Sequence, residues 1–122
     1  MFAQNVVIPL TTDGSGNCTA LSPNAVTGRV LAVLYNKGTL SGTPTVTVTT
    51  EQTQQAIVTL TAIAASANKY PRVPVHDETG TAATLNGTQA MREPVMVANE
   101  RVKVTVSGGG ATLAGTVTLV IG

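Results

Sequence analysis

The amino-acid sequence predicts an all-β protein, an antiparallel β-sandwich of about eight short strands with a jelly-roll or Greek-key arrangement. Polar residues alternate with valine or leucine over 45–50, 102–106 and 117–119, and a period of two places alternate side chains on opposite faces of a strand. Turn residues separate such segments at spacings of about 8–14 residues, which is typical of sandwiches and barrels. No segment has the periodicity of an amphipathic helix, so at most one helical turn is expected, at Thr53–Ala56 or Ala64–Asn68.

The first half of the chain contains five predicted strands. Pro9 marks an edge strand or a strand end, because proline donates no ladder hydrogen bond. Asp13–Asn17 reads as a hairpin turn, with Gly supplying positive φ and Asp and Asn bonding the local backbone. The continuous apolar run Val30–Leu34 is expected where both faces of a strand are covered. The predicted strands are Asn5–Leu10, Cys18–Leu21, Thr27–Tyr35, Thr45–Thr50 and Gln55–Ile63.

The second half of the chain begins irregularly and ends in regular strands. Pro71 and Pro74 exclude a central strand between Ala64 and Gly87, because neither residue has a backbone N–H. Gly108–Gly110 is predicted to close a hairpin onto the last strand, since no helix or Lys-Ser/Thr pair follows to make a phosphate loop. The predicted strands are Arg92–Val97, Arg101–Val106 and Leu113–Ile121, with short edge strands around Lys69–Val73 and Ala82–Leu85.

Length and composition indicate one domain over residues 1–122, with Met1–Gln4 as an exposed N-terminal arm. The core must be aliphatic, because only three residues are aromatic. The net charge of +1 and the scattered cations argue against a nucleic-acid binder. Cys18 has no cysteine partner for an internal disulfide, and neither a signal peptide nor a membrane span is expected, so synthesis in the cytoplasm is predicted.

Three motifs hint at chemistry, and each lacks a part that the chemistry requires. Ser66–Lys69 has the Ser-x-x-Lys spacing, but Tyr70-Pro71 follows where a helix would be needed. Asp13–Asn17 begins like a calcium loop, but Cys18 stands where that loop needs a glycine and Asn24 where it needs the closing carboxylate. His76–Glu78 offers a single histidine without a nucleophile or second ligand, and a loop-ordering role is favoured. No catalytic, metal-binding or cofactor-binding residue is predicted.

Two motifs have the character of interface anchors. In Tyr70-Pro71-Arg72 the fixed φ of proline holds a tyrosine beside an arginine, two residue types that dominate interface energetics. In Arg92-Glu93-Pro94 the two charges point to opposite faces of an extended chain, so each needs its own partner. Packing of these side chains against their own sandwich explains both motifs equally well, and the two interpretations stay open.

A further set of residues from Leu60 onward forms a recognisable pattern: Tyr70-Pro71-Arg72, His76-Asp77, Gly80, Asn86-Gly87, Arg92-Glu93-Pro94, Arg101-Val102-Lys103-Val104 and the closing glycine-rich segment. With these residues the sequence resembles small virion proteins that are encoded among the head genes of tailed bacteriophages. The N-terminal segments VVIPLTTDGSGN and TGRVLAVLY fit the same pattern, so the resemblance spans nearly the whole chain.

The resemblance implies a head decoration, or cement, protein. Such a protein is synthesised in the host bacterial cytoplasm, binds the exterior of the capsid, and stabilises contacts between subunits of the major capsid protein. Self-association is also implied, most simply as a trimer, with no direct nucleic-acid or membrane partner. The contact residues expected on this basis are Phe2, Tyr70, Arg72, His76, Arg92 and Glu93.

Two other classes of protein fit the sequence. One is a different virion component: a head-fibre base, a head–tail connector or a tail protein. The other is a carbohydrate-binding module, which would need an aromatic platform from Phe2, Tyr35 or Tyr70. An enzyme is not expected, because the residues that carry catalysis are so few.

Overall fold

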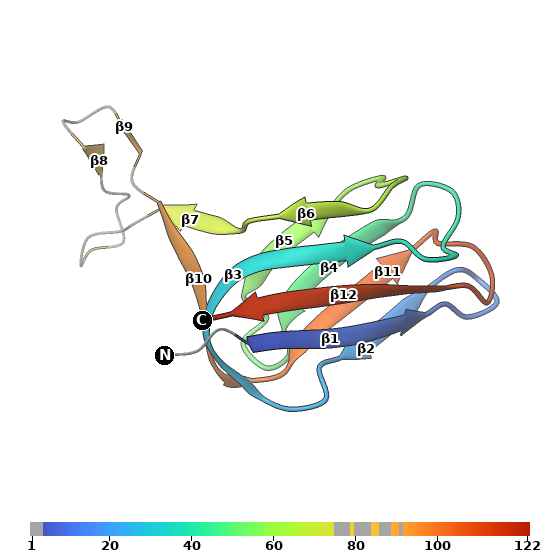
Figure 1. The fold of residues 1–122 in the computed structure, drawn as a ribbon, viewed down its shortest axis with the longest axis horizontal. Coiled ribbons are helices and arrows are strands. Elements are labelled where there is room, and N and C mark those ends of the chain that lie inside the picture. The colour runs from blue at the N-terminus through green and yellow to red at the C-terminus, as the bar shows by residue number, and fades with distance from the viewer. Residues whose placement is uncertain (1–3, 75–78, 80–83, 86–88, 91) are drawn as a thin grey trace.

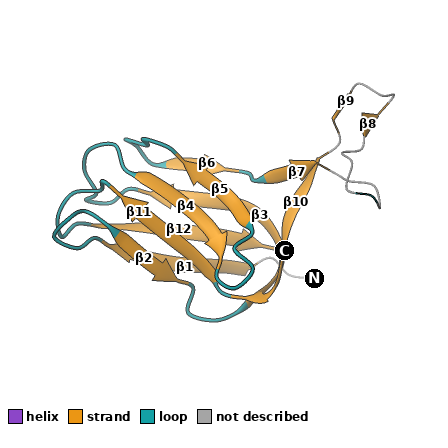
Figure 2. Cartoon of the chain, turned by 180° about the vertical axis from the view of Figure 1, so that it is seen from behind, coloured by secondary structure: helices purple, strands orange, loops and turns teal. Residues whose placement is uncertain are grey.

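The structure is a computed structural model that describes residues 4–74, 79, 84–85, 89–90 and 92–122, and it contains strands and no helix within them. Two antiparallel sheets pack face to face, which confirms the predicted β-sandwich (Figures 1 and 2). Sheet A has the order β1 (Gln4–Thr11), β12 (Ala114–Ile121), β3 (Val26–Asn36), β10 (Arg92–Glu100) and β7 (Arg72–Pro74), with β6 (Ala67–Lys69) also paired to β3. Sheet B has the order β2 (Cys18–Leu21), β11 (Val102–Ser107), β4 (Thr45–Thr50) and β5 (Ala56–Leu60), and β8 (Thr84–Leu85) pairs with β9 (Gln89–Ala90).

The long strands follow one another as a folded two-stranded ribbon. β1 pairs with β12, β2 with β11, β3 with β10 and β4 with β5, all antiparallel. These four strand pairs lie alternately in sheet A and sheet B. Within sheet A the first and third pairs are joined by the pairing of β12 with β3, and within sheet B the second and fourth are joined by the pairing of β11 with β4. Residues 61–91 are inserted between β5 and β10, and the short strands β6 and β7 run along the edge of sheet A.

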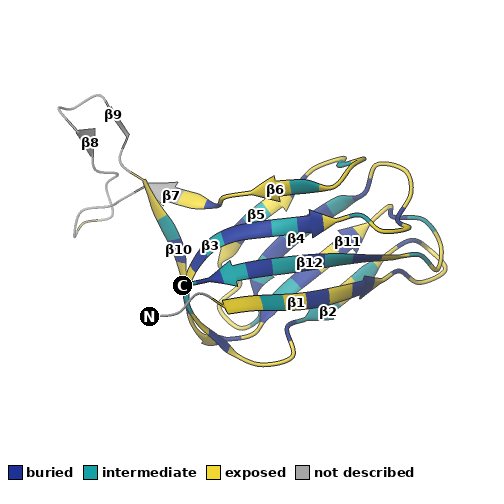
Figure 3. Cartoon of the chain, in the orientation of Figure 1, coloured by how far each residue is buried: buried dark blue, intermediate teal, exposed yellow. Residues whose placement is uncertain are grey.

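The core lies between the sheets and is built from the inward member of each alternating pair. Along β4 and β11 the valines are buried, while the threonines and lysine between them face outward or are half-buried (Figure 3). Leu31 and Leu34 in β3 are only half-buried, so the expectation that both faces of Val30–Leu34 are covered is wrong at these two positions. Fully buried side chains include Ile8, Leu10, Val30, Val33, Tyr35, Val46, Val48, Val95, Val102, Val104, Val117 and Leu119.

Two turns predicted as hairpins connect strands of different sheets. Gly108–Gly110 joins β11 of sheet B to β12 of sheet A, and Asp13–Asn17 joins β1 of sheet A to β2 of sheet B. The local chemistry is as predicted, because the carboxylate of Asp13 accepts the N–H groups of Ser15 (2.8 Å) and Asn17 (3.1 Å). The error arises because turn residues report the reversal of the chain and not the sheet to which it returns. The two connections contact each other, since Gly109 N donates to Gly16 O at 3.0 Å.

The inserted segment departs most from the predicted boundaries. The strand expected over Gln55–Ile63 ends at Leu60, where Ala62 turns the chain with φ of +50°. The edge strand expected around Lys69–Val73 is divided into β6 and β7 at Tyr70-Pro71. Neither of the two segments considered for a helical turn forms one, and within Ala82–Leu85 only β8 is described. Pro9 lies in an edge strand, as predicted.

Candidate interaction surface

Tyr70 and Arg72 lie where β6 passes into β7 at the edge of sheet A. Pro71 between them is buried, whereas Tyr70 is 63% exposed and Arg72 is exposed, so both flanking side chains point outward. The Arg72 Nη1 donates to the carbonyls of Pro71 (2.7 Å) and Leu31 (3.2 Å). These two bonds hold the guanidinium in place and leave its other N–H groups available to a partner.

The register of β7 against β10 brings the two predicted anchor motifs together. Pro94 lies opposite Arg72, and Arg92 lies opposite Pro74. Directly opposed residues of an antiparallel pair share a face, so Arg92 and Pro94 lie on the same outer face as Arg72. Glu93, opposite Val73, lies on the other face of β10. The sequence prediction that Arg92 and Glu93 point to opposite faces is consistent with this register.

Sequence reasoning missed two residues of the same surface. Met96, two residues beyond Pro94 on β10, is 57% exposed and lies opposite Arg29 of β3, which is also exposed. The alternation in the segment 92–97 could have placed Met96 beside Arg92 and Pro94, but no local signal shows that Arg29 pairs with it. We call the set Arg29, Tyr70, Arg72, Arg92, Pro94 and Met96 the arginine band.

The charge of the arginine band is one-sided within the described part of the chain. Three of the seven Lys and Arg residues belong to it. In this part of sheet A the one described carboxylate is Glu93, on the opposite face of β10. Neither Arg92 nor Glu93 makes a side-chain hydrogen bond or ion pair to a described residue. Phe2 and His76, the other predicted contact residues, lie outside the described residues, as do Asp77 and Glu78.

The outer face of sheet B has a different composition. The registers place Thr19, Thr105, Thr47 and Thr59 side by side on β2, β11, β4 and β5. These four residues form a row across the sheet that we call the threonine face. Its described cation, Lys103, is half-buried next to this row.

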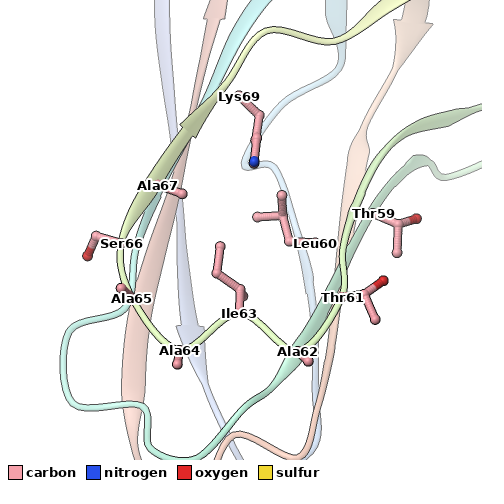
Figure 4. Close-up of a pocket in the computed structure, with 10 residues that line it drawn as sticks. All are labelled: Thr59, Leu60, Thr61, Ala62, Ile63, Ala64, Ala65, Ser66, Ala67 and Lys69. Atoms are coloured by element: carbon pink, nitrogen blue, oxygen red, sulfur yellow. The ribbon is translucent and has the colours of Figure 1, made fainter.

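A hollow of about 480 Å³ lies between the end of β5 and β6 (Figure 4). Leu60 and Ile63 point into it together with the Lys69 ammonium, while Ser66 points away. Ser66 Oγ accepts a hydrogen bond from Lys37 N at 3.1 Å, so the serine orders a loop and does not face Lys69. The Ser-x-x-Lys interpretation is thereby wrong in its geometry, and the hollow offers an apolar floor with a single cation.

The buried carboxylate of Glu100 has a structural role. It accepts the backbone N–H groups of Gln52 (2.9 Å) and Thr53 (2.8 Å) and the Thr53 hydroxyl (2.8 Å), and thereby fixes the turn after β4. The hydrogen bonds from Thr53 hold the pKa of the Glu100 carboxyl below its usual value of 4.5. Backbone hydrogen bonds, above all from Asn17, likewise lower the pKa of Asp13.

Three or more His, Cys, Asp or Glu side chains do not gather into a metal-binding group anywhere in the described ranges. A search of the same residues finds no helix with the length and apolar character needed to cross a bilayer. No protein-family model matches the sequence, and searches of curated proteins and of solved structures find no significant match.

Proposed function

We propose that this chain is a bacteriophage head decoration protein. It binds the outer surface of the assembled head and stabilises the contacts between major capsid subunits, by binding and without chemistry of its own. The observation that carries the proposal is the arginine band, which combines three arginines with Tyr70 and Met96, two of the three large hydrophobic side chains that are exposed among the described residues. Tyr, Met and Arg are the residue types enriched in protein–protein interfaces.

The ribbon-like pairing of the strands also supports the proposal. We interpret the folded ribbon, whose members alternate between the two sheets, as a jelly roll. Jelly rolls serve in viral capsid proteins and in lectins, so the topology fits a virion protein without distinguishing it from a sugar-binding one. The exposed aromatic residue available to a sugar among the described residues is Tyr70, and a single ring is a small platform for stacking a sugar.

Decoration by a small domain requires many weak contacts to act together. A homo-oligomer, which we propose to be a trimer, presents several copies of the band to neighbouring capsid subunits at once. Linking the contacts in this way raises the overall affinity without any new contact, because each later binding step is intramolecular. The sheet edge suits this role, since Arg72 is held by two backbone carbonyls before it meets a partner.

The proposal is tested with empty heads assembled from the major capsid protein of the phage that encodes the chain. Purified protein is mixed with heads and with free capsid subunits, and bound copies are counted after sedimentation and located by electron microscopy. We expect binding to assembled heads only, in many copies on the exterior, and an oligomer in analytical ultracentrifugation. A small number of copies at one vertex would instead indicate a connector, fibre or tail component, and a monomer that ignores heads would contradict the proposal.

A further inference from the structure

We infer that the arginine band docks on a carboxylate-bearing protein surface, so that the acceptor site for this chain is acidic. The inference deepens the proposed function, on which it rests for the identity of the partner as capsid protein. Arg29, Arg92 and Arg72 lie on one outer face of the neighbouring strands β3, β10 and β7, with Met96 opposite Arg29 and Tyr70 two residues before Arg72.

The geometry favours recognition of carboxylates over general attraction. Arg29 and Arg72 are both held by backbone carbonyls, Arg29 through Nε to Gly122 O at 3.4 Å and Arg72 through Nη1. An arginine held in this way loses less side-chain entropy on binding, and its planar fork matches the two oxygens of a carboxylate. Arg92 makes no side-chain hydrogen bond or ion pair to a described residue, and its guanidinium carries five N–H donors.

The apolar residues argue for protein rather than nucleic acid as the partner. Met96 and Pro94 alternate with inward-facing valines on β10, so they form a flat apolar strip beside the arginines. A duplex would present phosphates to the arginines and leave this strip without an apolar counterpart. A second copy of the chain is a poorer partner, because Asp13 and Glu100, two of its four described carboxylates, already accept several local hydrogen bonds.

The decisive comparison is Arg92→Glu against Arg101→Glu. Arg92 is the first residue of β10 and Arg101 follows its last residue; both are exposed, and each substitution changes the net charge by the same amount. We expect Arg92→Glu to weaken binding to heads at least about tenfold and Arg101→Glu less than about twofold. Arg92→Lys should retain more binding than Arg92→Glu, and the affinity of the unmodified chain should fall as salt is raised.

A second arm does not depend on heads. Retention of the unmodified chain, Arg92→Glu and Arg101→Glu on a carboxylate-bearing resin is compared at several salt concentrations. Arg92→Glu should elute well before Arg101→Glu although the net charges of the two variants are equal. Equal retention and equal head binding of the two variants would overturn the inference. If Arg92→Glu alone loses retention on the resin while none of the proteins binds heads, the proposed function is rejected and the inference stands.

The remaining outcomes each identify a competing occupant. A change in oligomeric state on Arg92→Glu, with head binding intact, would assign the band to contacts between copies and overturn the inference. Binding of duplex DNA that is abolished by Arg92→Glu and exceeds binding to heads would do the same. A fall in thermal stability with head binding intact would show that Arg92 serves the fold, and it would also overturn the inference.

Discussion

The outer faces of the two sheets differ although their inner faces are alike. Both sheets direct valine, leucine and isoleucine into one shared core. On its outer side sheet B carries the threonine face, with Thr19, Thr105, Thr47 and Thr59 in one row. At its edge sheet A carries the arginine band, with two exposed apolar side chains among three arginines. This difference indicates that the inward-facing residues of each strand specify the fold, whereas the outward-facing residues can vary and are available for binding.

The threonine face shows what an outer face looks like when strand formation is its main constraint. Threonine has a high β propensity, and its hydroxyl keeps the surface from collecting apolar partners. Nothing about strand stability requires Tyr70 or Met96 to be exposed at the edge of sheet A, where each leaves apolar surface in contact with water. The partner proposed above would account for the exposed aromatic and thioether side chains at this edge.

The largest effect on stability is expected when a threonine, typical of the outer face, is placed at an inward-facing position of the same strand. Val104→Thr places a hydroxyl at a fully buried position of β11, and we expect the free energy of unfolding to fall by about 1–3 kcal/mol because the hydroxyl lacks a ready partner. The reverse exchange at its exposed neighbour, Thr105→Val, should change stability by less than about 0.5 kcal/mol. Urea denaturation measures both. Equal losses would show that the threonine face is not a passive surface.

The next largest effect on stability is expected at Glu100, and the other glutamate of β10, Glu93, should not show it. Glu100→Gln should destabilise the protein at neutral pH, because the turn after β4 loses its charged acceptor. The folded-state pKa of Glu100 is lowered, so its contribution is present above its usual value of 4.5 and is lost as pH falls through the folded value. Exposed Glu93 provides the matched control.

Urea midpoints measured from about pH 7 down to about pH 3 distinguish the variants. Glu100→Gln should lose less stability on acidification than the unmodified chain, with a residual dependence from Asp13 in both proteins. Glu93→Gln should follow the unmodified chain throughout. An unchanged acid profile in Glu100→Gln would contradict the structural role assigned to this carboxylate.

The sequence predicted the long strands and did not predict how they connect or where the strands next to the inserted segment end. Alternation of the kind seen in Thr45–Thr50 is local and predicted β4 with its observed bounds, and the local turn residues on either side of Cys18–Leu21 did the same for β2. The return of the chain after Gly108–Gly110 depends on which strands are already paired, and that is a property of the whole fold. The same distinction applies to the candidate surface. The motifs at Tyr70 and Arg92 were found in the sequence because they are local, whereas Arg29 and Met96 became visible only from the register of β3 against β10.

A smaller effect, of opposite sign, concerns the core tyrosine. Tyr35 is 2% exposed and its hydroxyl has no hydrogen-bond partner among the described residues, so burial raises the pKa of its phenol above the usual value of 10.0. Tyr35→Phe removes the unsatisfied group, and we expect the free energy of unfolding to rise by about 1 kcal/mol. Denaturation in urea measures the change. A loss of stability would instead reveal a partner for the hydroxyl in the folded protein.

The smallest effect on stability is expected at the tyrosine of the arginine band. Tyr70→Ala removes a ring that is 63% exposed, so the free energy of unfolding should change by less than about 0.5 kcal/mol. Binding to heads should nevertheless weaken, because exposed tyrosines in a band of arginines are typical interface anchors. Val7→Ala is the control, since Val7 is 51% exposed on β1 and lies outside the band. If Tyr70→Ala lowers stability and leaves binding unchanged, the ring packs on its own sandwich, and the contrast between the two outer faces no longer indicates a partner.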